Sequence, residues 1–211
     1  MSETESVTQL FGLDVFEDVL ARYGDATIDR VGIEETTLHL TSPLADPVGN
    51  ERVAFLVTIH CENLQGCGEA APAWWIGDSD LPSVQRDLQR WAHGVAGSKL
   101  ATWLGDAGDV CLRSLTATPA ARAAIQCAAI DALARAANAS VAQLIAGPNA
   151  SSAVPVSALL GSGDEAFTAQ AARQARDAGV TRLKLKVGGS PVSDRARIDA
   201  VLANVGPETR V

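Results

Sequence analysis

A short segment near the end of the chain, RLKLKV at residues 182–187, alternates charged and apolar side chains. This period of two is typical of a β-strand, and it places Lys184 and Lys186 on one face and the apolar residues on the other. The chain has only three lysines, and the third is Lys99. Two ammonium groups on one strand face are therefore the most distinctive chemical feature of the sequence.

The segments around this strand predict alternating strands and helices. Val154–Leu160 is predicted as a buried strand, Asp164–Ala178 as an amphipathic helix with Phe167 on its apolar face, and Val192–Asn204 as a second helix. Gly179 supplies the C-terminal cap of the first helix. The last two residues come where another strand should start. Strands and helices that alternate through short links indicate the start of a parallel (β/α) barrel, incomplete in this chain.

The face that carries the two lysines has two interpretations. In a barrel the apolar face packs on helices, so Lys184 and Lys186 point inward, near the C-terminal mouth where barrel enzymes hold their active sites. Two neighbouring ammonium groups repel, which favours the loss of a proton from one of them and suits it to act as a base. Arg182 lies on the same face of the strand as the two lysines. The alternative is therefore that this face is the solvent-exposed side of an ordinary two-sided strand. The crossover helices on either side favour the barrel.

Residues 27–150 predict an α+β domain. Three strands joined by short connections indicate an antiparallel meander: Ile28–Leu40, Val53–His60, and a short third strand that Gly66-Cys-Gly-Glu69 leads into after a turn at Asn63–Gly66. A helix follows over Leu81–Ala96, with an N-cap from Asp78-Ser-Asp80. The alanine-rich Pro119–Ala137 is a second helix, capped by Thr118.

Residues 1–26 form an N-terminal extension. Asp14 and Glu17 indicate the start of a short helix. An apolar stripe on this helix begins at Val15 and Phe16 and continues on the next helical turn. This helix either docks on the body of the protein or on a second subunit, or the segment is a loosely held terminal arm.

The composition narrows the class of protein. Of the 211 residues, 47% are hydrophobic, which excludes disorder as a global description, and the net charge of −8 argues against nucleic acid or an anionic membrane as the main partner. No apolar run approaches the roughly 18 residues of a membrane span, and the first residues lack the features of a secretory signal. These observations predict a cytoplasmic protein. The four cysteines form no CxxC pair, so reduced thiols are expected, and the three histidines show no metal-ligand spacing.

An ordered set of motifs resembles the enolase superfamily, in its muconate lactonizing enzyme branch. The segments that carry the resemblance are the Lys-x-Lys strand within Gly179–Gly188, the GxGE-x-x-P pattern at Gly66–Pro72, the cap-ending helix at Ala120–Leu144 with Asp131 in its middle, and the first barrel strand at Val154–Val156. The resemblance extends from about Ile28 to Val211. It implies a capping domain over residues 27–150 and the first βα units of a TIM-type barrel over residues 151–211, truncated in this chain.

The resemblance also implies a chemistry. Lys186 would be the acid/base that removes a proton next to a carboxylate, and Lys184 would support it and help to neutralise the substrate carboxylate. Such sites use Mg²⁺ to stabilise the ene-diolate that forms. The metal-binding carboxylates of the family lie on later barrel strands, beyond Val211. We therefore expect no metal ligands among residues 1–211, and no turnover of substrate by the 211-residue chain alone.

The same resemblance implies substrate contacts in the cap, at Trp74, Trp75 and Ile76. The alternative for the two tryptophans is a partly buried packing pair. The expected activity is a lyase or isomerase reaction on a small carboxylate substrate. An o-succinylbenzoate synthase-like dehydratase is the first choice, with dipeptide epimerase, N-acylamino acid racemase and muconate cycloisomerase as alternatives. A non-catalytic oligomerisation or regulatory module is the alternative from another class, because an open barrel edge favours self-association. A flavodoxin-like domain is disfavoured, since no glycine-rich phosphate loop follows the first predicted βα strand.

Overall fold

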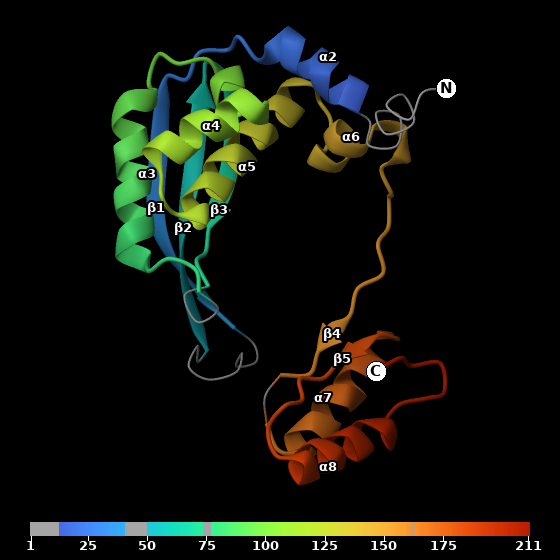
Figure 1. Cartoon of the computed structure of the whole chain (residues 1–211). Helices are drawn as coiled ribbons and strands as arrows, with labels where there is room; N and C mark the ends of the chain where they lie inside the picture. Colours follow the sequence, from blue (N-terminus) through green and yellow to red (C-terminus); the bar gives the residue numbers. More distant parts are fainter. Residues whose placement is uncertain (1–12, 41–49, 74–76, 162) are drawn as a thin grey trace. The chain divides into compact units, whose positions relative to one another are not determined.

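The computed structural model describes residues 13–40, 50–73, 77–161 and 163–211 (Figure 1). The chain divides into two compact units, one from Met1–Leu38 and Val53–Ser152 and the other from His39–Arg52 and Ala153–Val211. The expected architecture is confirmed: an α+β capping domain comes first and the start of a (β/α) barrel follows. Within the described residues, no helix has the length and apolar character needed to cross a bilayer.

The first unit contains a three-stranded antiparallel sheet in the order β1-β2-β3. Its strands are β1 (Arg30–His39), β2 (Glu51–Cys61) and β3 (Leu64–Ala70). The predicted turn at Asn63–Gly66 is wrong. The turn is Glu62–Asn63, so Cys61 pairs directly with Leu64, and Glu62 adopts the left-handed conformation at φ 52° that such a tight turn requires. The Gly-x-Gly-Glu motif consequently lies inside β3 rather than leading into it.

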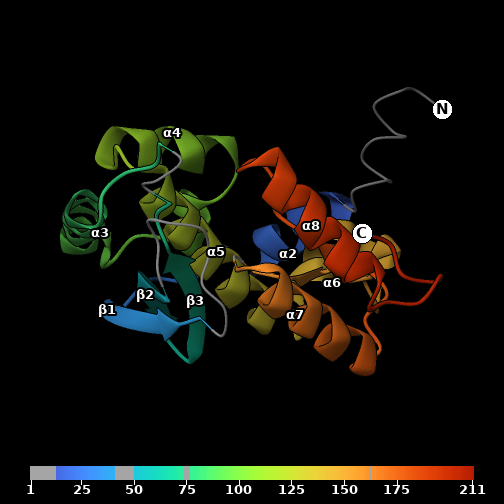
Figure 2. The same cartoon turned by 90° about the horizontal axis from the view of Figure 1, so that it is seen from below.

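Helices α3 (Leu81–Val95) and α5 (Pro119–Ala136) lie over one face of this sheet, and α4 (Gly105–Leu115) packs against these two helices (Figures 1 and 2). Asp80 caps α3 as predicted, because its carboxylate accepts a hydrogen bond from the Ser83 amide at 2.7 Å, and hydrogen bonds from Ser83 lower the pKa of this carboxyl. Thr118 precedes α5, but its hydroxyl makes no capping bond. Its amide instead donates to the buried Asp87 of α3 at 2.8 Å.

The sequence analysis missed α4 and the short 3₁₀ helix η2 (Leu100–Trp103) before it. The glycines Gly105 and Gly108 weaken the helical pattern of this segment. The structure shows why Gly108 is there: a Cβ atom at this position would collide with the backbone of Trp103. A tight junction between the two helices therefore explains a residue that disfavours helix formation.

Helix α5 packs directly on strand β3, and small residues on both elements allow this contact. A Cβ atom at Gly66 would collide with the backbone carbonyl oxygen of Ala128, and a Cβ atom at Gly68 would collide with that of Ala124. Both alanines are fully buried. The Gly-x-Gly spacing of β3 thus matches the four-residue spacing of alanines along α5, and backbone meets backbone without a side chain between them.

Asp131, in the middle of α5, also binds β3. Its carboxylate accepts a hydrogen bond from the Cys67 amide at 2.9 Å and pairs with Arg135 one turn later at 3.0 Å. Since β3 is an edge strand, the helix satisfies a backbone donor that no neighbouring strand reaches.

The N-terminal extension contains α2 (Leu13–Tyr23), which packs against α5 and α6 (Val141–Ala146). Phe16, Leu20 and Tyr23 lie against the core of the first unit. Of the expected alternatives, the helix docked on the body is the one found. After α6 a 3₁₀ turn, η3 (Gly147–Asn149), ends the helical region.

The second unit contains two short parallel strands, β4 (Ala158–Leu159) and β5 (Leu183–Lys184), and two helices, α7 (Glu165–Asp177) and α8 (Pro191–Leu202). The core of this unit consists of four buried residues, one from each strand region and helix: Leu160, Ala172, Leu183 and Val201.

The predicted buried strand Val154–Leu160 is mostly wrong. Only Ala158–Leu159 forms a strand, and Val154 and Val156 are 72% and 71% exposed. A hydrophobic strand is buried only when neighbours cover it, and β5 is the only strand paired with β4 among the described residues. For the same reason Phe167, expected on a buried helix face, is half-exposed.

Candidate active site

Lys184 is the last residue of β5, and Lys186 follows two residues later. Leu183 is 5% exposed and packs in the core of the second unit, and Leu185 packs against the same core. Lys184 and Lys186 are exposed. The alternation of RLKLKV therefore has the predicted consequence: its leucines contact the helices and its lysines face away from them.

The neighbouring strands complete this face. Leu159 of β4 pairs in parallel register with Lys184, so both side chains point to the same side of the sheet. On the other side of β5, Arg182 bridges to Arg210 in parallel register, and the Leu183 amide donates to the Arg210 carbonyl at 2.8 Å. This isolated parallel bridge lies where the sequence predicted the start of another strand.

Lys186 lies beyond the last paired residue of β5, at the C-terminal end of the strand. The ladder with the β4 region ends where the Leu160 amide donates to the Lys184 carbonyl at 3.1 Å. In parallel (β/α) sheets this end of the strands is where substrates bind. The position of Lys186 is therefore the one that barrel enzymes use for chemistry.

Two polar residues of α8 that the sequence analysis missed lie next to this end of β5. Asp194 accepts hydrogen bonds from the Gly188 and Gly189 amides, and Arg197 donates one to the Lys186 carbonyl at 3.0 Å. The sequence holds one signal for them. The Asp-x-x-Arg spacing puts both side chains on one helix face that follows a glycine turn.

The sequence also predicted substrate-contacting residues in the cap and an absence of metal ligands. Trp74, Trp75 and Ile76 lie outside the described residues. Within the part of the chain that the structure describes, no three His, Cys, Asp or Glu side chains are grouped so that they could hold a metal ion. The residues present therefore do not fit a magnesium site by themselves.

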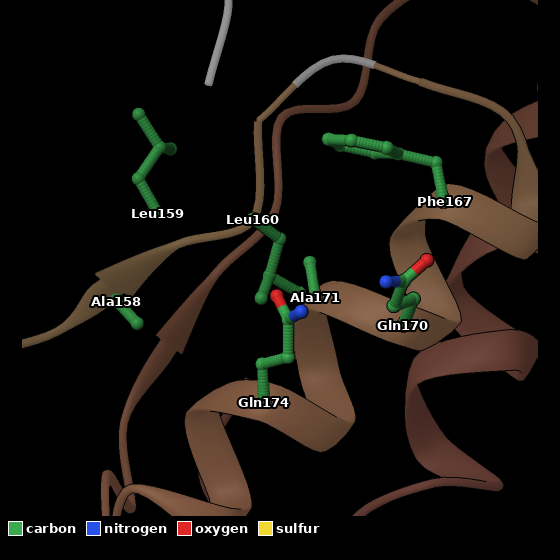
Figure 3. Close-up of a pocket in the computed structure, with 7 residues that line it drawn as sticks. All are labelled: Ala158, Leu159, Leu160, Phe167, Gln170, Ala171 and Gln174. Carbon is green, nitrogen blue, oxygen red and sulfur yellow. The ribbon is translucent and has the colours of Figure 1, made fainter. Parts of the chain in front are cut away.

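A cavity of about 400 Å³ lies between β4 and α7, and Figure 3 shows the side chains that line it. It is lined by Ala158, Leu159, Leu160, Phe167, Gln170, Ala171 and Gln174. The lining contains no ionisable side chain, so the cavity has no group that could transfer a proton. It lies beside the edge of β4 opposite β5, where the described residues supply no further strand.

Residues 33–146 match the family described as the mandelate racemase/muconate lactonizing enzyme N-terminal domain, which is more than half of the chain. The chain belongs to this family of the enolase superfamily, as the motifs indicated. No curated protein matches the chain.

Solved structures of the same superfamily resemble the chain over most of its length. A dipeptide epimerase from Enterococcus faecalis V583, complexed with Mg and the dipeptide L-Leu-L-Tyr, is 24% identical with a TM-score of 0.78, over 87% of this chain and 52% of its own. A protein from Sorangium cellulosum described as a mandelate racemase/muconate lactonizing enzyme is 29% identical with a TM-score of 0.73, over 88% and 52%. An N-succinyl Arg/Lys racemase from Bacillus cereus ATCC 14579 is 22% identical with a TM-score of 0.76, over 86% and 50%. The chain spans about half the length of these structures.

Proposed function

We propose that this chain forms the cap and the first barrel strands of an enzyme that removes the proton next to a substrate carboxylate, with Lys186 as the acid/base. The observation that carries the proposal is that Lys184, at the C-terminal end of β5, and Lys186, two residues beyond it, are exposed, whereas Leu183 and Leu185 pack in the core of the second unit. In (β/α) barrels this end of the strands carries the catalytic residues. The family of the chain supports the same reading, because its solved relatives include an epimerase and a racemase.

The two lysines have different roles in this proposal. A proton next to a carboxylate is weakly acidic, so the base must approach it closely and the growing negative charge must be stabilised. Lys186, two residues beyond the end of β5, takes the proton. Lys184 offsets the charge of the substrate carboxylate.

A metal ion would add to this stabilisation, but the described residues hold no ligand set for one. We propose that the ligands belong to later barrel strands on a longer polypeptide, which fits the half-length match to the solved structures. The 211-residue chain alone would then be inactive.

Two reactions share this first proton transfer. An o-succinylbenzoate synthase-like dehydration follows it with loss of a leaving group, whereas an epimerase or racemase returns a proton to the opposite face. Epimerisation or racemisation is supported by a similar solved structure, which is a dipeptide epimerase with a bound dipeptide. A small carboxylate is the substrate in both.

The test is α-proton exchange in D₂O by the longest polypeptide that contains this chain, with Mg²⁺ present. The probes are L-Leu-L-Tyr and the substrate of o-succinylbenzoate synthase. We expect either deuterium at the α-carbon of L-Leu-L-Tyr, as an epimerase would give, or dehydration of the second probe with loss of its α-proton, and we expect Lys186→Ala to abolish whichever reaction is seen. Lys99→Ala is the matched control, because Lys99 lies in the first unit and pairs with Asp25 at 2.6 Å.

Exchange that survives in Lys186→Ala would show that another group is the base. Neither exchange nor dehydration with either probe, together with a stop codon directly after Val211, would favour the non-catalytic module.

A further inference from the structure

Two side chains of α8 hold the backbone at the point where β5 ends. Building on the proposed role of Lys186, we propose that Asp194 and Arg197 are positioning residues that direct the Lys186 ammonium by fixing the peptide groups around it. The ladder of β5 ends at Lys184, so in the described residues no strand holds the Lys186 peptide. The Lys186 peptide must therefore be held by side chains outside the sheet.

Asp194 fixes the turn after Lys186. One oxygen of its carboxylate, Oδ2, accepts hydrogen bonds from the Gly188 amide at 2.8 Å and from the Gly189 amide at 3.1 Å. Gly188 has φ +121°, a conformation that side chains rarely adopt, so this turn depends on both the glycine and the carboxylate. Because these two amides are already bound, the turn is not free to bind an anionic ligand.

Arg197 fixes the peptide of Lys186 itself. Its Nη1 donates to the Lys186 carbonyl at 3.0 Å and lies 3.6 Å from Asp194 Oδ1. Its Nε makes a longer contact of 3.5 Å with the hydroxyl of Thr168, which is buried in α7 and donates to the Asp164 carbonyl at 2.7 Å. One guanidinium therefore connects α7, α8 and the carbonyl of the proposed base.

The burial of this pair argues for a role beyond stability. The side chains of Arg197 and Asp194 are only 12% and 15% exposed, and Arg197 Nη2 is buried with no hydrogen-bond partner among the described residues. A buried ion pair contributes little net stability compared with apolar residues of the same size. Arg195, on the same helix, shows the ordinary arrangement, since it is exposed and pairs only with Asp199.

The first experiment tests the contact in this chain. Labelling lysine with ¹³C at the carbonyl gives three NMR signals, from Lys99, Lys184 and Lys186. We expect Arg197→Met to shift the Lys186 carbonyl signal upfield, as the loss of a donor should, and to leave the Lys99 signal in place. Arg195→Met is the matched control and should move none of them. An unchanged Lys186 signal in Arg197→Met would overturn the contact.

The second experiment tests positioning in the longer polypeptide, with α-proton exchange of the two probes named above. We expect Arg197→Met to lower kcat about 100-fold with KM unchanged, since a displacement of about 1 Å at the reacting group costs that much. Arg197→Lys, which keeps one donor, should recover part of the rate. Asp194→Asn, which keeps an acceptor for the turn, should also retain part of it.

The outcomes separate this proposal from the one on which it rests. If Lys186→Ala abolishes exchange and Arg197→Met behaves like Arg195→Met, the positioning role is wrong and the proposed function stands. If Lys186→Ala keeps full exchange, the proposed function is wrong and the positioning role falls with it. The carbonyl signal decides in either case whether the contact exists.

Discussion

The two units of this chain bury one face of a sheet under helices, but they do so to different degrees. In the first unit α3 and α5 lie over a three-stranded sheet, and α5 meets β3 so closely that Gly66 and Gly68 admit no Cβ atom. In the second unit only Leu160, Ala172, Leu183 and Val201 are buried together, and large apolar side chains such as Val154 and Val156 are exposed. In the first unit helices bury the apolar face of the sheet. In the second unit the strands that carry the lysines have few neighbouring strands and helices among the described residues, so apolar side chains stay exposed.

The largest effect is expected at the contact between α5 and β3. Gly68→Ala would force a methyl group into the Ala124 carbonyl, and we expect the free energy of unfolding of the first unit to fall by about 3 kcal/mol. Urea unfolding followed by tryptophan fluorescence measures this, because residues 153–211 contain no tryptophan.

Gly94→Ala on α3 is the matched control for this substitution. A Cβ atom at Gly94 meets nothing within 4 Å, and alanine favours helix more than glycine, so this variant should be about 0.5 kcal/mol more stable. Equal destabilisation by the two substitutions would contradict the close packing of α5 on β3.

We expect the second unit to self-associate, because a second copy can cover the apolar side chains that this chain leaves exposed. Leu159 is half-exposed on the open face of β4, and burying it against another copy would stabilise a dimer by about 1.4 kcal/mol. Leu159→Glu should therefore weaken association roughly tenfold in sedimentation velocity. Val110→Glu, at an exposed position of α4, is the control and should change nothing. A chain that stays monomeric at high concentration would refute this expectation.

The smallest effect concerns the thiols of the first unit. Burial, with a smaller contribution from Asp29 and Glu62, raises the pKa of Cys61 to about 11 from an ordinary value of 9.0. At pH 8 the Cys61 thiolate is therefore roughly 100-fold rarer than that of an ordinary thiol. Native alkylation with iodoacetamide should modify the exposed Cys67 and Cys127 and spare Cys61, as peptide mass spectrometry would show. Rapid loss of the Cys61 thiol would mean that the first unit opens readily.

Patterns with a clear local cause were predictable from the sequence. The alternation of RLKLKV predicted that the leucines pack and the lysines are exposed, and the N-cap of α3 was predicted within Asp78-Ser-Asp80, where Asp80 supplies it. The cap followed by a barrel start could also be read from the order of the motifs. These features depend on periodicity and on capping chemistry, which act over a few residues.

Features set by distant contacts were not predictable. Gly108 made α4 hard to predict, because the need for a glycine there comes from the backbone of Trp103 and not from its sequence neighbours. Only Ala158–Leu159 of the strand expected at Val154–Leu160 forms, because the described residues supply no partner strand along its outer edge. Asp194 and Arg197 look like an ordinary helical pair in the sequence. Only the fold shows that they reach the end of β5 instead of solvent.

Hydrogen exchange, compared between the units and between this chain and the longer polypeptide, tests the account most directly. The amides of β3 and α5 should exchange roughly 1,000-fold more slowly than those of β4 and β5 in the 211-residue chain, and the latter should become protected when the barrel is complete. If β4 and β5 are already as protected as β3 in the short chain, the second unit is self-sufficient and the proposal of an unfinished catalytic barrel is wrong.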